Sequence, residues 1–556
     1  MRFLRRIGFV VLASSMALAQ TGGQAKDSSV ADDLKALREA VAAQQAQIAQ
    51  QQQQMSEQQQ QINTLERALE QKTAGAPQVE NAALTTNNAP AVAVTQADVQ
   101  KPKESPLSFR IGGTDFTPGG FVDFHNIFRT ENTGNVVSTG FNGIPFSNTP
   151  AGQLTEFRST GQYSRWNLKI SGKYGENNIV GFVEGDFNGN DPANVFVTTN
   201  PHTLRLRLFY LTLRRGKWEF TAGQAWGLMT PNKVGVSPHG ADLATTTAAD
   251  GNIHVGVFYS RDGQLRVAFH PNDKFSWAFA AENPQQITAG QIITPSAFSG
   301  TTNTQLANQL DGAATPGVPN AFPDLITKLA YDTKLGSRAF HVEAGGMITS
   351  VKLAAQTATA GAPNGAPAAG SPFNKHTKIG SGFLGGINLE VAKNVRFMTY
   401  GMYGTGMGRY FIGSGPQYVV APVALTPTTF DIAISMVRAG SGFGGFEAQV
   451  TPKTLLAAYY GGIYFGRNAF QDISSTAATK PIIGFGGTGS ASTNNRAIQE
   501  GSFVLTQTLW KHPQYGALLF INDASYTTRA PWAHAATAPK NAHMFMDHVV
   551  LRYVIP

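Results

Sequence analysis

Alternating apolar and polar residues recur in short segments between Pro106 and Pro556, and each segment is typical of a β-strand. Successive side chains of a strand point to opposite faces, so each segment has one apolar wall and one polar or small wall. Three segments show the pattern clearly: Ser164–Ser171, with Trp166, Leu168 and Ile170 on the apolar side; Gln264–His270, with Leu265, Val267 and Phe269; and Lys274–Glu282, with Phe275, Trp277 and Phe279. We therefore expect an all-β structure.

The joints between these segments alternate between short and long. The short joints are Lys173–Asn177, Arg215–Gly216, Pro271–Asp273, Leu335–Ser337, Ala392–Asn394, Thr451–Lys453 and His512–Gln514. The long joints are Thr130–Thr160, Gly189–Pro201, Gly227–Asn252, Asn283–Phe322, Val351–Ile379, Gly406–Phe430, Gly466–Ala497 and Arg529–Ala542. Seven turns and eight loops connect sixteen antiparallel strands, with short turns on one side and long loops on the other. This is the pattern of a transmembrane β-barrel.

A β-sandwich would show the same alternation, but one of this length needs several cores, and no domain boundary is visible in the region. In a closed barrel every backbone N–H and C=O pairs with a neighbouring strand, so no sheet edge meets lipid. The last strand alternates as well, although the chain ends in Ile555-Pro556 and lacks the usual terminal Phe. About sixteen strands leave an interior too wide for side chains to fill, so we expect an aqueous channel.

The residues before the barrel form three further parts. Residues 1–19 are a predicted signal peptide, because Arg2, Arg5 and Arg6 precede a short apolar run and Ala17-Leu18-Ala19 offers a cleavage site. Residues 28–72 are a predicted α-helical coiled coil, with an apolar residue at every seventh position from Leu34 to Leu69. A disordered Gln-rich linker is the alternative for that part. Residues 73–105 read as a flexible tether, and residues 106–556 as the barrel domain.

Composition and charge sharpen this picture. Only 14% of the residues are charged, against about 25% in an average soluble protein, and the net charge is +8. The chain has no cysteine, which fits an oxidising compartment but is weak evidence alone. Lys or Arg in contact with lipid costs roughly 2–4 kcal/mol at the middle of the membrane. We therefore expect mid-strand basic residues to face the interior.

Alternation assigns a set of charged residues to the inner face of the first half of the barrel. The basic members are Arg165, Lys169, Arg205, Arg207, Arg266 and Lys328, and the acidic members are Glu184 and Asp186. A basic wall beside an acidic one would favour dipolar or anionic solutes in a channel. The alternative is that the two carboxylates only neutralise the arginines and brace adjacent strands. Both interpretations can hold, since a braced arginine still has donors to offer.

The long joint Gly227–Asn252 follows the fifth strand, and we expect its polar residues Lys233, His239 and Asp242 to line a constriction if the loop folds inward. An ordinary exposed loop is the other interpretation. On the fourth strand, the faces blur at Phe209-Tyr210-Leu211, which a β-bulge or a subunit contact would explain.

Signals for other functions are weak. The chain has no Gly-x-Ser-x-Gly elbow, no His-Glu-x-x-His motif and no Walker loop, so we expect neither an enzyme nor a cofactor. His534, His543 and His548 cluster only in sequence, and we expect no metal site. No basic run or basic helix points to nucleic acid.

Several short stretches resemble the DcaP-type trimeric porins. They are Glu184–Phe187, Leu204–Arg207, Ala222–Trp226, Phe275–Trp277 with Glu282–Pro284, Pro323–Leu325, Gly406–Tyr410 and the hairpin Gly445–Tyr460. The resemblance implies a sixteen-stranded homotrimer in the outer membrane, among outer-membrane lipid and lipopolysaccharide, that passes small negatively charged solutes such as dicarboxylates. A structural role is the alternative: the coiled coil, in the periplasm, would contact peptidoglycan and the barrel would be only an anchor.

Overall fold

The barrel domain is described by a computed structural model that covers residues 105–556, except 135–136, 190–202, 285–291, 299–305, 307–308, 310–319 and 362–370. The predicted signal peptide, coiled coil and nearly all of the tether lie outside these residues. No helix in the described part of the chain is long and apolar enough to cross a membrane.

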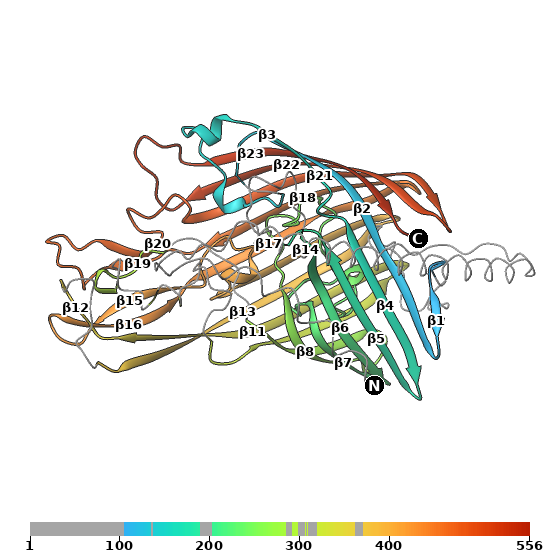
Figure 1. Cartoon of the computed structure of the whole chain (residues 1–556), viewed down its shortest axis with the longest axis horizontal. Helices are drawn as coiled ribbons and strands as arrows, with labels where there is room; N and C mark the ends of the chain where they lie inside the picture. The colour runs from blue at the N-terminus through green and yellow to red at the C-terminus, as the bar shows by residue number, and fades with distance from the viewer. Residues whose placement is uncertain are drawn as a thin grey trace, which may run out of the picture. The chain divides into compact units, whose positions relative to one another are not determined.

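The described residues form strands and a few single-turn 3-10 helices (Figure 1). The strands are β1 (Phe109–Ile111), β2 (Thr114–Arg129), β3 (Glu156–Thr160), β4 (Arg165–Tyr174), β5 (Asn177–Asp186), β6 (Arg205–Arg215), β7 (Trp218–Trp226), β8 (Arg261–Phe269), β9 (Phe275–Glu282), β10 (Asp324–Leu335), β11 (Arg338–Gln356), β12 (Ala358–Thr359), β13 (Phe373–Ala392), β14 (Val395–Thr405), β15 (Tyr418–Ala424), β16 (Thr429–Met436), β17 (Arg438–Thr451), β18 (Thr454–Phe465), β19 (Asn468–Gln471), β20 (Ile482–Phe485), β21 (Asn495–His512), β22 (Gly516–Pro531) and β23 (Ala542–Val554). The 3-10 helices are η2 (Phe141–Gly143), η3 (Pro150–Gln153), η4 (Gly240–Asp242), η5 (Ser296–Phe298) and η7 (Gly408–Tyr410).

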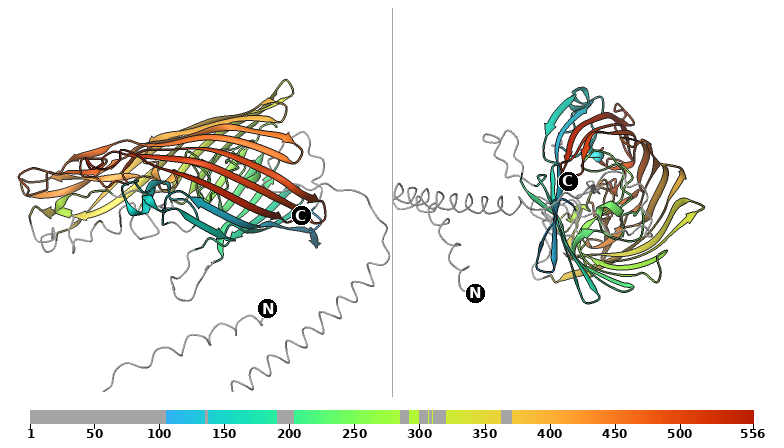
Figure 2. Two further views of the ribbon diagram at one scale, coloured as in Figure 1. Left: turned by 90° about the horizontal axis from the view of Figure 1, so that it is seen from above. Right: turned by 90° about the vertical axis from the view of Figure 1, so that its right-hand side faces the viewer.

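One antiparallel sheet of eighteen described strands closes on itself. Its short members β1 and β3 flank the two ends of β2, and the other sixteen strands form the barrel wall, as the sequence predicts. The seam pairs the first wall strand with the last, in a register that starts at Phe121 opposite Val554. Seen end-on in Figure 2, the strands form a ring around loop segments. The sheet therefore has no free edge at the seam.

The seven short turns lie where the sequence predicts them. Gly216 and Gly336 adopt positive φ in two of them, which a residue with a side chain adopts only at a cost. Three of the expected long loops have wrong bounds. The loop Gly227–Asn252 runs on to Ser260, because β8 begins only at Arg261. β11 and β13 run past Val351 and Ile379 as one long hairpin, and Phe430 begins no wall strand. It lies instead in β16, which pairs with β12 and β15 in a small separate sheet over its own apolar cluster.

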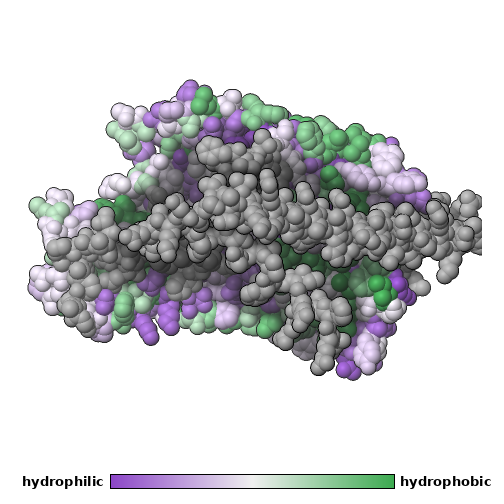
Figure 3. Space-filling model, viewed as in Figure 1, coloured by the Kyte–Doolittle hydropathy of each residue, from purple (hydrophilic) through white to green (hydrophobic). Residues whose placement is uncertain are grey.

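The outer surface of the barrel carries the apolar side chains that alternation assigns to it. Leu265, Val267, Trp277 and Phe279 are all exposed. On the parts of the face that Figure 3 leaves uncovered, hydrophobic surface gathers toward the upper right, where the wall strands run. This exposure is what a lipid-facing wall requires.

A β-bulge interrupts the pairing of β5 with β6. Glu184 lies opposite Leu208 while the next residue, Gly185, lies opposite Leu206, so Arg207 is the extra residue. Arg207 and Leu208 are consequently both buried, and the exposed positions continue at Phe209 and Leu211. The bulge thus explains the blurred alternation on this strand.

The loop between β7 and β8 fills part of the interior. Its buried residues Leu228, Val255 and Phe258 belong to a large apolar cluster that also includes Ala280 on β9 and Tyr400 on β14. Its polar contacts reach strands that lie around the ring, from β10 and β11 to β18, β21 and β22. The expectation of a wide open interior is therefore corrected: a loop packs against much of the wall and confines open space to the rest.

Candidate functional site

Two cavities adjoin inside the barrel, with volumes of about 180 Å³ and about 610 Å³. They share four lining residues, namely Arg205, Arg207, Tyr259 and Arg261. The larger cavity also meets the long loops at Asn142, Ile412 and Gly413. The smaller one meets Phe121 on β2, Arg165 on β4, Arg552 on β23 and the interior loop from His239 to Ile253. The four shared residues therefore lie where the larger cavity, which reaches the long loops, joins the smaller cavity, which reaches strands β2, β4 and β23.

The charged residues of β5 and β6 form one ion-pair network at this junction. Arg205 donates from Nε and Nη2 to the two carboxylate oxygens of Asp186, at 3.0 and 2.8 Å. Arg207 donates from Nε to Glu184 at 2.9 Å and from Nη1 to Asp186 at 2.6 Å. The side chain of Arg205 is 35% exposed and that of Arg207 is 9% exposed. The two arginines are therefore braced, and Arg205 still offers donors to the cavity.

Arg165 and Arg552 continue the basic lining into the smaller cavity. Their guanidinium carbons lie 5.2 and 4.1 Å from the centre of the Phe121 ring. Arg552 is also paired with both oxygens of Asp123, at 2.6 and 2.7 Å. Arg165 lies 3.7 Å from Glu184, a looser contact. The aromatic ring between them fixes two cations side by side.

Arg261 is not among the lining residues predicted from the sequence. It is half-buried at the start of β8 and lines both cavities. Within the described residues no carboxylate lies within ion-pair distance of Arg261, whose guanidinium instead stacks over Trp226 at 5.3 Å. Alternation along β8 would place the side chain of Arg261 on the same outward face as Leu265. The two-residue period of the strand therefore could not predict that Arg261 lines the cavities.

Two predicted lining residues have a different position. Lys328 and Arg266 are buried and line neither cavity. The ammonium of Lys328 donates to the carbonyl of Thr230 at 2.8 Å and lies 3.1 Å from Glu343. Arg266 donates to the carbonyls of Trp226 and Val236, at 2.6 and 3.0 Å. Both cations hold the interior loop against the wall. Lys169 is exposed and also lines neither cavity.

The three predicted loop residues divide in the same way. His239 lines the smaller cavity, its Nδ1 accepts from the backbone N–H of Ala241 at 3.3 Å, and burial lowers the pKa of its ring. Asp242, whose carboxyl pKa is raised by burial, and Lys233, whose ammonium pKa is lowered by burial, line neither cavity. They are joined through the backbone, where the N–H of Lys233 donates to the carbonyl of Asp242 at 2.7 Å.

The far part of the loop packs against the wall through glycines on both sides, Gly256 in the loop and Gly442 and Gly461 in the wall. Gly256 has φ +96°, and a Cβ there would lie 2.2 Å from the carbonyl oxygen of Gly442. A Cβ on Gly461 would lie 1.9 Å from the carbonyl oxygen of Val255. The backbone N–H of Val255 donates to Glu500 at 2.7 Å, and Ser441 donates to the carbonyl of Gly256 at 2.8 Å. Loop and wall therefore meet backbone to backbone.

Among the residues that the structure describes, no group of three or more His, Cys, Asp or Glu side chains could hold a metal ion. The two cavities are lined by arginine donors and aromatic faces, together with the carboxylates of Glu184, Asp250 and Asp262.

The closed antiparallel wall of sixteen strands with an interior loop is the fold of an outer-membrane porin. It is similar to the outer membrane channel DcaP of Acinetobacter baumannii, with a TM-score of 0.52 and 16% identity over 81% of this chain and 100% of that one. The resemblance noted in the sequence is thus confirmed at the level of the fold. An anion-selective porin from Comamonas acidovorans aligns with a TM-score of 0.41 and 10% identity, over 80% of this chain and 100% of that one. No protein-family model and no curated protein matches the chain.

Proposed function

We propose that this chain is a porin that passes small hydrophilic solutes across the outer membrane and prefers anions, dicarboxylates among them. The observation that supports the preference is the lining of the two adjoining cavities, in which arginines outnumber carboxylates. The arginines are Arg165, Arg205, Arg207, Arg261, Arg409 and Arg552, and the carboxylates are Glu184, Asp250 and Asp262. A series of fixed cations along a narrow path lowers the energy of an anion and raises that of a cation.

Arg261 contributes most to the proposed anion preference. The other five arginines lie within 4 Å of a carboxylate, so part of their charge is offset. Arg261 has no such partner within the described residues and stands where the two cavities meet. A solute carboxylate is the group that would complete its hydrogen bonding.

The test is the reversal potential of the purified protein in a planar bilayer under a KCl gradient. We expect a chloride-selective current that succinate or phthalate blocks. A cation-selective current would contradict the proposed preference while leaving a porin. The same measurement on a chain that lacks residues 28–72 should give the same current, because the proposed path lies in the barrel.

A structural anchor is the second candidate, and the packing of the loop between β7 and β8 in the interior favours it. In that case the proposed periplasmic coiled coil would contact peptidoglycan and the barrel would be closed. Well-folded trimers without conductance would select this candidate. The homotrimer itself is a proposal, to be tested by the mass of the detergent-solubilised particle.

A further inference from the structure

Three exposed arginines gather on the outer surface of the wall, on the side of the long loops. Arg438 begins β17, Arg467 follows β18, and Arg496 is the extra residue of a β-bulge near the start of β21. Because β18 pairs with both β17 and β21, the three arginines lie on adjacent strands. The backbone N–H of Gly466 donates to the carbonyl of Arg438 at 2.8 Å, which places Arg438 beside Arg467. We call these three residues the arginine cluster.

A tryptophan holds two members of the arginine cluster in place. The guanidinium carbons of Arg467 and Arg496 lie 4.8 and 5.9 Å from the centre of the Trp532 ring. Trp532 itself is fixed, because its indole N–H donates to the carbonyl of Phe465 at 2.9 Å and a Cβ on Gly486 would lie 2.5 Å from its Cδ1. An arginine stacked on an aromatic ring keeps the N–H donors along its edge available. The cluster is therefore partly ordered before a ligand arrives.

The positive charge of the arginine cluster is not balanced by nearby carboxylates. The acidic residues that are nearest to its members in sequence, Asp431, Asp472 and Glu500, are buried and accept hydrogen bonds from other groups. Along the fully described strands β17, β18, β21 and β22, no exposed residue is acidic. A surface with three cations and no counter-charge attracts anions from its surroundings.

The aromatic residues below the arginine cluster place it at the level of the lipid headgroups. Tyr460 and Tyr526 are exposed on the outward face of the same strands, and Tyr464 follows in the direction of the long loops. Tyrosine and tryptophan mark the boundary between hydrocarbon and headgroups in transmembrane barrels. Tyr464 lies opposite Gly440, so Arg438 stands two residues further out, which is about 7 Å along the strand. The cluster therefore lies just beyond the hydrocarbon, where lipid phosphates are found.

We propose that the arginine cluster binds the phosphate groups of a glycolipid in the outer leaflet of the outer membrane. Guanidinium groups bind phosphate oxygens through pairs of parallel N–H donors, and three of them match a headgroup with more than one phosphate. The long loops of outer-membrane barrels face the cell exterior, so the outer leaflet meets the cluster. A lipid also contacts the tyrosines below the arginines, which a free phosphate ion does not. The site lies outside the wall, so the inference does not depend on the proposed channel.

The experiment measures the binding of lipid A, a diphosphorylated glycolipid, to the purified full chain in detergent by native mass spectrometry. We expect the variant Arg438→Gln, Arg467→Gln, Arg496→Gln to bind lipid A roughly tenfold more weakly than the native chain, because it loses charge-assisted hydrogen bonds to phosphate. Lipid A from which the phosphates have been removed should bind the native chain as weakly as lipid A binds the variant. All three side chains are exposed, so we expect the variant to fold.

The matched control removes the same charge from the opposite end of the wall. The variant Arg214→Gln, Arg215→Gln, Lys217→Gln changes three exposed cations on the side of the short turns and should keep the native affinity for lipid A. Equal affinities in the two triple variants, or equal binding of lipid A with and without its phosphates, would overturn the proposal. Loss of the oligomer in the arginine variant, with unchanged lipid A affinity, would show that this face packs on a second copy of the chain and would also overturn it.

A second measurement reports on the surface beside the arginine cluster. Because the chain has no cysteine, Gln499→Cys on the exposed side of β21 carries a single fluorophore, three residues from Arg496. Its emission should shift when lipid A is added and should not shift with inorganic phosphate. No shift with lipid A, or an equal shift with inorganic phosphate, would contradict a lipid site. Neither measurement uses current, so a protein without conductance leaves this inference unaffected.

Discussion

The guanidinium carbon of Arg261 lies 5.3 Å from the centre of the Trp226 ring, and the two residues are cross-strand partners on β8 and β7. The ring holds the cation in place without neutralising it, in contrast to the carboxylates that hold Arg205 and Arg207. A positioned cation without a counter-charge is the group that best attracts a passing anion.

Replacing Arg261 with Gln should therefore weaken the anion preference. A charge pair at about 4 Å in water is worth about 1 kcal/mol, so the chloride-to-potassium permeability ratio should fall roughly fivefold. The ratio follows from the reversal potential. Arg215→Gln is the control, because Arg215 lies at the exposed end of β6 and its loss should leave the ratio unchanged. An unchanged ratio in the Arg261 variant would remove this residue from the proposed path.

Asp186→Asn separates bracing from selectivity. The carboxylate is 2% exposed and serves both Arg205 and Arg207, so its loss leaves two cations partly unpaired. Removing one partner of a buried ion pair costs about 3–5 kcal/mol, while the anion preference should rise. Unfolding by urea in lipid vesicles and the reversal potential measure the two effects. Asp115→Asn, whose partner Arg110 is exposed, should change neither.

Gly256→Ala should displace the interior loop without unfolding the barrel. The new Cβ would meet the carbonyl oxygen of Gly442 at 2.2 Å, and φ +96° is strained for alanine. Because the wall strands keep their own hydrogen bonds, the expected result is a changed conductance at nearly native barrel stability. Gly240→Ala on the same loop has open space around its Cβ and should behave as the native chain. Equal currents from both variants would show that the close backbone contact at Gly256 does not fix the position of the interior loop.

His254 should make the stability of the loop sensitive to acid. Burial lowers the pKa of its ring to about 4, against about 6.5 in the unfolded chain. The folded state thus binds this proton less readily, so stability is full above pH 6.5 and is lost as pH falls toward 4, by about 3 kcal/mol in total. Unfolding free energies across this range should decline less in His254→Gln. Parallel curves for the two proteins would show that His254 does not set this dependence.

The barrel could be predicted because its signals are local. A period of two along Gln264–His270 and the short turns at Gly216 and Gly336 depend only on neighbours in sequence. The pairing of Arg205 and Arg207 with Glu184 and Asp186 was also within reach, since adjacent strands joined by a loop bring these residues into register.

The remaining features depend on contacts that alternation does not encode. Lys328 and Arg266 point inward as their strands require, but a loop that covers them decides whether they meet water. Arg261 reaches the cavities from the end of its strand, where the period no longer fixes the direction. Likewise, the strand propensity of Thr429–Met436 does not reveal that it pairs outside the wall.

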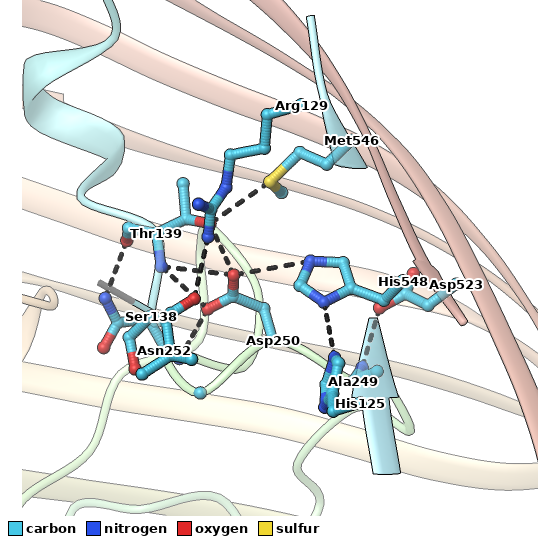
Figure 4. A network of polar contacts seen from close by, with 12 residues as sticks. His125, Arg129, Ser138, Thr139, Ala249, Asp250, Asn252, Asp523, Met546 and His548 are labelled. Atoms are coloured by element: carbon cyan, nitrogen blue, oxygen red, sulfur yellow. Dashed lines mark hydrogen bonds and ion pairs between the residues drawn. The ribbon is translucent and has the colours of Figure 1, made fainter. Parts of the chain in front are cut away.

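The seam between β2 and β23 has a consequence for assembly. Asp250 and Ala249 bind Thr139 beyond β2 and Asp523 on β22, so the loop lies across the line where the two ends of the sheet join (Figure 4). These bonds join residues that are far apart in the chain, so we expect them to form late in assembly, after the strands around them have paired. Once formed, they add hydrogen bonds beside the closure and hold the sheet together where its two ends meet.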